Sequence, residues 1–437
     1  MTVRRRTLSA AIAIGLAATA TAPAAVAADG NRGRPGTGIT SVTAITQIFT
    51  FGQEVAAVAV EYPAVVNPRT LDLGTFTVSD SIYNFRFSPL EDLATRADRT
   101  ITRVYTNDEA TIDPDGTSEP GRFVIIELDP ADAGGNTVMR STCSGFLCYE
   151  KINPDLPTEV VQNEDVYAQP GNGQGRGRVL AEAGPTSHPL SGETVNLLAD
   201  EFHYETYLHA GMAVPYAYHL PADYDPAREY PLVVVLPGWG SGYNGVNEGV
   251  QVAVDISTTA WLQEEWTGSD EDVIVLSPQT QRVGTDAESA AMVALLDEFM
   301  GRFSVDGGRV YVQTFSWGST LAWDAMADRP GIFAGVLIAA GFPVSAAQAA
   351  LIAQDLTPVW ITHGTNDPVL PVTFGQTSVQ VLRDAYVAAG LDPAAAADLV
   401  RYTEFPPEAY AVPDYHAVVG PTYETQSILA WLLAQGD

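Results

Sequence analysis

Three residues in the C-terminal half of the chain have the types and the order needed for acyl-transfer chemistry: Ser316, then Asp367, then His416. A serine hydroxyl is a weak nucleophile near neutral pH, so it needs an imidazole within hydrogen-bond reach to take its proton. A carboxylate must in turn hold the imidazole in the productive tautomer and stabilise its cation. Serine, acid, histidine is one of the chain orders of such triads, and it predicts that these residues form one.

The serine lies where the apolar segment 310–315 runs into a turn. A nucleophile on a strand-to-helix elbow needs small neighbours, and Gly318 provides one two positions later. Two positions earlier stands Thr314, where the elbow motif G-x-S-x-G has glycine. The motif T-F-S-W-G is therefore degraded, and a helix N-cap is an alternative role for Ser316.

The base and the acid also have alternatives. His363 is the other histidine downstream of the serine, but we assign it a structural role because the base comes last in this chain order. Asp367 follows the end of a strand, and a structural role in an Asx turn is the alternative to a catalytic role. Asp414 is two residues from His416 and too close to it in sequence, so we predict the pair Asp367 and His416.

An oxyanion hole requires two backbone N–H groups aimed at the developing negative charge. Trp317, directly after the serine, is one candidate donor. The other is Trp239, in the glycine-rich turn after the apolar strand 231–236. A turn without function is the alternative, but the carboxyl ends of core strands are where open α/β sheets place their sites.

These residues lie in a segment, 197–437, in which apolar strands alternate with helical stretches. Continuous apolar strands are typical of a parallel sheet that is buried on both faces, and alternation with helices predicts a doubly wound α/β domain. The expected strands are 231–236, 273–276, 310–312, 336–339 and 359–362, and the expected helices are 287–303, 319–327, 379–389 and 425–433.

The segment 36–168 has a different pattern of apolar and polar residues. Short alternating strands separated by Gly, Pro, Asn and Asp predict a β-sandwich; they are 45–51, 55–62, 75–78, 101–105 and 123–128. The only two cysteines, Cys143 and Cys148, predict a disulfide, because a metal site would need partner ligands that are not apparent nearby. Residues 169–196 are rich in Gly and Pro and predict a linker.

The first 28 residues combine three arginines, a short apolar run and an Ala-x-Ala site, which predicts a secretory signal peptide of Sec or Tat type and therefore export. An uncleaved anchor helix is the alternative. No internal segment is long and apolar enough to suggest a membrane span. The formal net charge of −31 disfavours binding to nucleic acid or anionic membranes.

The segment from about Tyr204 to the C-terminus resembles secreted α/β-hydrolase esterases of the polyhydroxybutyrate-depolymerase-like and feruloyl-esterase-like group, related to prolyl-oligopeptidase-type peptidases. The resemblance is collinear and is carried by Pro215-Tyr216, Tyr230 to Gly238, Ser277-Pro278-Gln279, Val305-Asp306, Thr357 to Pro371 and Val400 to Pro406. The segments Gly52-Gln53 and Glu61-Tyr62-Pro63 resemble the immunoglobulin-like domain that precedes some of these esterases.

The resemblance implies an α/β-hydrolase fold preceded by an all-β immunoglobulin-like sandwich. It implies a serine carboxylesterase without metal or organic cofactor, acting on small-molecule or polymeric esters. Two departures, Pro237 for the usual histidine before Gly238 and Thr314 for glycine, affect the oxyanion turn and the elbow. An aminopeptidase or oligopeptidase, and a non-catalytic surface or polymer-binding protein on a hydrolase scaffold, are the alternatives.

Overall fold

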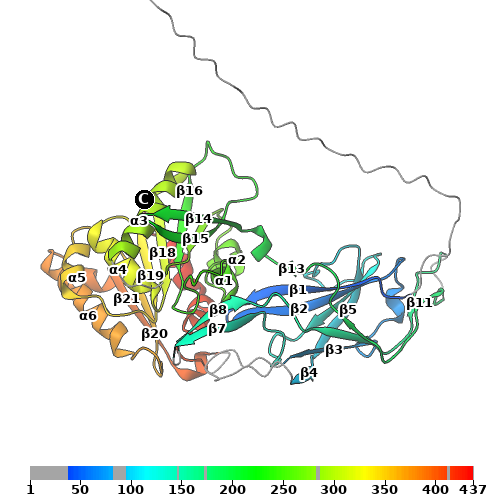
Figure 1. Cartoon of the computed structure of the whole chain (residues 1–437). Coiled ribbons are helices and arrows are strands. Elements are labelled where there is room, and N and C mark those ends of the chain that lie inside the picture. Colours follow the sequence, from blue (N-terminus) through cyan, green and yellow to red (C-terminus); the bar gives the residue numbers. More distant parts are fainter. Residues whose placement is uncertain are drawn as a thin grey trace, which may run out of the picture. The chain divides into compact units, whose positions relative to one another are not determined.

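The computed structural model describes residues 38–81, 95–144, 147–171, 175–281, 286–410 and 414–436 (Figure 1). The predicted signal peptide, residues 1–28, lies outside the described residues. None of the helices in these ranges has the length and apolar character that crossing a bilayer requires.

The N-terminal domain is built from two sheets. One has the strand order β13-β1-β2-β6-β5 and the other β12-β9-β3-β4. The main strands are β1 (Ser41–Phe49), β2 (Gly52–Glu61), β3 (Phe76–Ser81), β4 (Arg96–Asp98), β5 (Ile101–Asn107), β6 (Phe123–Leu128) and β9 (Glu159–Gln162). Alternate residues of both sheets, such as Val58, Val60, Val78 and Val160, share one buried core. This arrangement confirms the predicted β-sandwich.

Part of the segment predicted as a linker, 169–196, belongs to this domain. It contains β11 (Val179–Ala181), β12 (Ser187–Pro189) and β13 (Val195–Asn196). These strands pair with β10 (Val166–Tyr167), β9 and β1 respectively. The glycines and prolines of this segment predicted its irregular connections. The short strands between them complete sheet edges, and their pairing depends on the neighbouring strands rather than on the local sequence.

The C-terminal domain contains an eight-stranded sheet in the order β14-β15-β17-β16-β18-β19-β20-β21. The pairs β14/β15 and β15/β17 are antiparallel and the others are parallel. The strands are β14 (His203–His209), β15 (Met212–His219), β16 (Tyr230–Leu236), β17 (Ile274–Pro278), β18 (Val305–Phe315), β19 (Gly335–Ala339), β20 (Val359–Gly364) and β21 (Val400–Phe405). The five predicted strands correspond to β16 to β20.

Two hydrophobic cores cover the two faces of this sheet. On one face, even-numbered residues of β16 such as Val234 pack with α3, α4, α5, α6 and α7. On the other, odd-numbered residues such as Val235 pack with α1, α8 and α9. The helices are α1 (Val250–Ala253), α3 (Asp286–Arg302), α4 (Gly318–Asp328), α5 (Ala346–Ile352), α6 (Thr373–Ala388), α7 (Pro393–Leu399), α8 (Val419–Glu424) and α9 (Gln426–Leu433); a short α2 (Glu264–Thr267) precedes β17. Burial on both faces explains the continuous apolar strands.

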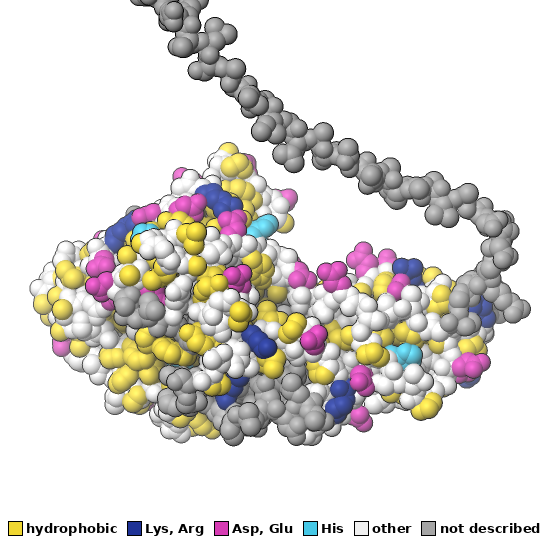
Figure 2. Space-filling model, viewed as in Figure 1, with side chains coloured by type: hydrophobic (Ala, Val, Ile, Leu, Met, Phe, Trp, Pro, Cys, Tyr) yellow, Lys and Arg dark blue, Asp and Glu magenta, His cyan; other side chains and the backbone are white. Residues whose placement is uncertain are grey.

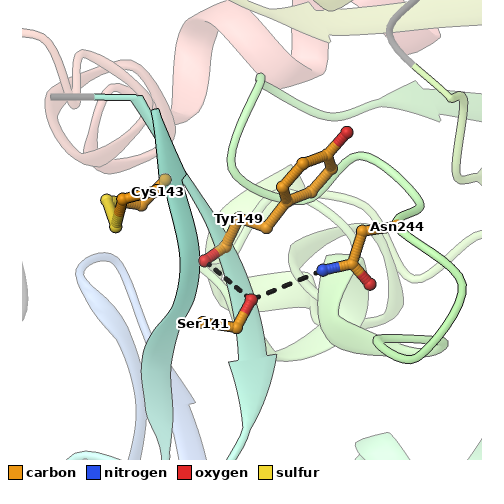
Figure 3. Close-up of a disulfide and its surroundings, with 5 residues drawn as sticks. Ser141, Cys143, Tyr149 and Asn244 are labelled. Carbon is orange, nitrogen blue, oxygen red and sulfur yellow. Dashed lines mark hydrogen bonds between the residues drawn. A yellow bond between two sulfur atoms is a disulfide. The ribbon is translucent and has the colours of Figure 1, made fainter. Parts of the chain in front are cut away.

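A separate two-stranded hairpin extends from the N-terminal domain. It consists of β7 (Val138–Ser144) and β8 (Leu147–Ile152), and it lies beside α1 of the C-terminal domain (Figure 1). Cys143 and Cys148 face each other across the two strands and form a disulfide, which confirms the predicted bond (Figure 3).

Acidic side chains do not gather in one patch on the face shown in Figure 2. Asp and Glu are spread over both domains there, between apolar and neutral polar residues. The negative charge is therefore spread over this face rather than gathered in one patch.

Candidate active site

Ser316 lies at the sharp turn between β18 and α4. Its backbone has a φ of 50°, a left-handed conformation that is uncommon for a residue other than glycine. The Ser316 N–H donates a 2.9 Å hydrogen bond to the carbonyl of Ala339, and its carbonyl accepts the Ser319 hydroxyl at 2.7 Å. Neighbouring strands and the first helical turn therefore hold the serine in this conformation.

The residues two positions after and two positions before Ser316 differ in the space around their Cα atoms. A Cβ atom at Gly318 would collide with the backbone of Leu236, so this position requires glycine. Thr314, by contrast, lies within β18 and is fully buried. It pairs with Leu236 and Ile338 in the parallel ladder. The threonine is thus accommodated by the strand, and the left-handed turn at Ser316 is retained.

The structure brings the three predicted residues together at the carboxyl end of the sheet. His416 Nε2 lies 3.0 Å from Ser316 Oγ, and His416 Nδ1 lies 2.7 Å from Asp367 Oδ2. Ser316 and His416 are each less than one tenth exposed. With Nδ1–H donating to the carboxylate, Nε2 is left as the acceptor for the serine proton. This is the geometry that nucleophile activation requires.

The loop after β20 fixes Asp367. Its Oδ1 accepts the N–H groups of Val369 and Leu370 at 2.8 and 2.9 Å, and its side chain is fully buried. Burial favours the neutral acid, but hydrogen bonds from His363 and His416 outweigh it and lower the pKa of Asp367 to about 2. Asp367 is therefore a carboxylate at neutral pH.

Two residues weighed as alternatives have other contacts. His363 is fully buried, and its Nε2 lies 3.0 Å from the carbonyl of Leu370 and 3.4 Å from Asp367 Oδ2. Asp414 accepts the backbone N–H of His416 at 3.2 Å through Oδ1. Asp367 thus contacts the imidazole, while Asp414 contacts the backbone of the same histidine and His363 supports the acid.

The two candidate oxyanion donors lie on facing turns. Trp239 follows β16, Trp317 precedes α4, and their indole rings pack edge to face with centroids 4.9 Å apart. Within the described part of the chain, the Trp317 backbone N–H has no acceptor, as expected at the start of a helix. The catalytic role of both N–H groups remains a prediction.

A cavity of about 310 Å³ opens beside Ser316 and His416. Its apolar wall contains Trp239, Trp317 and Phe342. Tyr415, the residue before His416, does not line this cavity; its carbonyl accepts the Tyr410 hydroxyl. The remaining lining residues from the C-terminal domain are Gly238, Gly240, Ser241, Val254, Asp255, Phe315, Val369, Leu370 and Asp414.

Three further lining residues come from the hairpin β7–β8: Arg140, Cys148 and Glu150. Sequence reasoning did not place them at the site. The cysteine pair marks a stapled loop, but the sequence contains no signal that this loop reaches a site on another domain. The cavity wall is therefore built by both domains.

Comparisons with known proteins agree with this architecture. Residues 41–173 match the family model of the esterase Ig-like N-terminal domain, and residues 271–392 match the phospholipase/carboxylesterase family. The chain therefore combines an immunoglobulin-like domain with the α/β-hydrolase fold, which confirms the predicted fold class. Both of its domains are thus similar to domains of known esterases.

The individual proteins that the chain resembles are also named as esterases. A crystal structure of a thermostable esterase is 25% identical, covers 91% of this chain and all of its own, and has a TM-score of 0.75. Feruloyl esterase C from Emericella nidulans is 28% identical over 170 residues, 37% of this chain and 58% of that protein. A probable feruloyl esterase C from Aspergillus terreus is 23% identical over 168 residues, 37% of this chain and 57% of that protein. The chain thus spans little more than half the length of these curated relatives.

Proposed function

We propose that this protein is an exported serine carboxylesterase that works through an acyl-enzyme intermediate. The observation that carries the proposal is the continuous set of contacts from Ser316 Oγ through the His416 imidazole to the Asp367 carboxylate, beside a cavity. The esterase matches of both domains support the same reaction class. The apolar run and basic residues at the N-terminus support export.

In the proposed mechanism, Ser316 Oγ attacks the ester carbonyl while His416 Nε2 takes the hydroxyl proton. Asp367 stabilises the imidazolium through Nδ1–H. The N–H groups of Trp239 and Trp317 donate to the oxyanion of the tetrahedral intermediate. Protonated His416 then gives its proton to the leaving alcohol, and the acyl-enzyme forms. A water molecule, deprotonated by His416, reverses these steps and releases the acid.

The lining of the cavity suggests the substrate class. Trp239, Trp317 and Phe342 offer flat apolar surfaces, and a cavity of about 310 Å³ has room for a short acyl chain or one substituted aromatic ring. The curated relatives are named feruloyl esterases. We therefore place aromatic and short-chain acyl esters first among the substrates, ahead of polyesters.

Replacement of the nucleophile tests this function. Ser316→Ala should lower kcat for p-nitrophenyl butyrate by about 10³-fold or more, because the acyl-enzyme cannot form. Ser187→Ala, an exposed serine of the N-terminal domain, is the matched control and should retain wild-type kcat. Wild-type turnover by Ser316→Ala, or failure of the folded wild type to react with a fluorophosphonate, would falsify the assignment. Faster turnover of peptide anilides than of esters would favour a peptidase instead.

A further inference from the structure

Glu150, on the hairpin of the N-terminal domain, makes three contacts with the turn after β16. Its backbone N–H donates to the Gly240 carbonyl at 2.9 Å. Its backbone carbonyl accepts Asn247 Nδ2 at 3.0 Å, and its carboxylate Oε2 accepts the Ser241 hydroxyl at 3.2 Å. One residue of the sandwich domain therefore binds the turn that carries the candidate oxyanion donor Trp239.

The Glu150 carboxylate also packs directly against Gly240. A Cβ atom added to Gly240 would collide with this carboxylate. The absence of a side chain at this position thus lets the acidic group approach the turn backbone. Glu150 therefore contacts both residues that follow Trp239, through the carbonyl of Gly240 and the hydroxyl of Ser241.

The hairpin is itself held in place. Ser141 Oγ donates to the Tyr149 carbonyl at 3.2 Å across the two strands, and it accepts Asn244 Nδ2 from the C-terminal domain at 3.4 Å (Figure 3). The disulfide Cys143–Cys148 joins the same two strands. Asn247 Nδ2 additionally donates to the Gly242 carbonyl at 2.9 Å, so Glu150 and the turn share one network.

We propose that Glu150 is a positioning residue for the oxyanion turn, so that the N-terminal domain takes a direct part in catalysis. This inference rests on the proposed esterase function. An oxyanion donor contributes only when it is held within a fraction of an ångström of the position that the charge will occupy. Two backbone hydrogen bonds anchor residue 150 to the segment after β16, and the Glu150 carboxylate adds the hydrogen bond from Ser241 and the packing against Gly240. The direction of the Trp239 N–H depends on this turn.

The test compares Glu150→Ala with Glu150→Gln in the full-length protein, using p-nitrophenyl butyrate. Glu150→Ala should lower kcat by roughly 10-fold with KM nearly unchanged, because the lost restraint acts on the transition state. Glu150→Gln keeps an acceptor for the Ser241 hydroxyl and should recover most of kcat. Glu159→Ala, an acidic residue on β9 of the same domain, is the control and should equal the wild type.

Ser241→Ala shows whether the carboxylate acts through the turn. If it does, the double variant Glu150→Ala/Ser241→Ala should lose no more kcat than Glu150→Ala alone. Unchanged kcat in Glu150→Ala, or an effect confined to KM, would overturn the proposal. Should Glu150→Ala fail to fold, a normal kcat in Ser241→Ala overturns it equally. The Ser316→Ala measurement separates this result from failure of the esterase assignment, since the positioning role can fail while Ser316 remains essential.

Discussion

At the scale of single residues, the site depends on one strained position and on close contacts around it. Ser316 adopts a left-handed backbone that its neighbours over-determine, and Gly318 leaves the space that α4 needs beside β16. Thr314, in contrast, is an ordinary strand residue of β18. Its hydroxyl is buried and has no hydrogen-bond partner among the described residues. The threonine that replaces the glycine of the elbow motif therefore affects the stability of the protein more than the geometry of Ser316.

Replacing this threonine with an isosteric apolar residue tests that interpretation. Thr314→Val should raise the free energy of unfolding by about 1 kcal/mol, because it removes an unsatisfied buried hydroxyl and keeps the β-branched shape. Its kcat should stay within about twofold of the wild type. Urea unfolding followed by fluorescence, together with the esterase assay, measures both. Thr314→Gly should instead destabilise the protein, since it leaves a cavity and a flexible strand residue.

At the scale of elements, the hairpin β7–β8 connects the sandwich to the site. A two-stranded hairpin is marginally stable alone, and the disulfide closes this one near its tip. By loop-closure entropy such a short cross-link is worth about 2 kcal/mol. Because Cys148 and Glu150 both line the cavity, the order of the hairpin and the shape of the site are coupled.

Removing the disulfide should therefore lower the catalytic rate more strongly than it lowers the stability of the domain cores. In Cys143→Ala/Cys148→Ala, kcat for p-nitrophenyl butyrate should fall several-fold, while the melting temperature changes by only a few degrees. Dithiothreitol should lower the wild-type rate in the same way and leave the double variant unaffected, since these are the only cysteines in the chain. Equal rates with and without the bond would contradict the coupling.

At the scale of the whole molecule, the sandwich contains a buried charged cluster that makes stability depend on pH. Glu54 lies on β2 and is 2% exposed, close to Arg99, Asp80 and Asp132. Arg99 contacts Asp132 at 3.1 Å and Asp80 at 3.7 Å. Burial raises the pKa of Glu54 to about 8; Arg99 opposes this shift, and the neighbouring carboxylates add to it.

The sign of the pH effect follows from this shift. Below a pH of about 4.5, the ordinary pKa of the group, Glu54 is protonated in both the folded and the unfolded chain. Between there and about pH 8 only the unfolded chain ionises, so the free energy of unfolding should fall as pH rises. Glu54→Gln should flatten this dependence and stabilise the protein near pH 8. Urea titrations across that range measure it, with Glu159→Gln as the control. An equally steep dependence in Glu54→Gln would contradict the assignment.

Much of the fold follows from local patterns in the chain. Five continuous apolar strands alternating with helical stretches predict the core of the α/β domain, and short alternating strands predict the sandwich. The antiparallel strands β14 and β15 and the last strand β21 were missed. β14 is a largely exposed strand at the edge of the sheet, where a strong apolar pattern is not needed. β15 lies between β14 and β17, and its pairing with both depends on those neighbours.

The sequence by itself determined which residues have the chemistry of a nucleophile, a base and an acid, because residue type and chain order are local properties. The tertiary structure decided which of them meet: Asp367 rather than Asp414 contacts the His416 ring. It also decided that Glu150 and the Cys143–Cys148 hairpin reach the same cavity. Contacts between domains depend on packing over long sequence separations, and no pattern within a single segment specifies them.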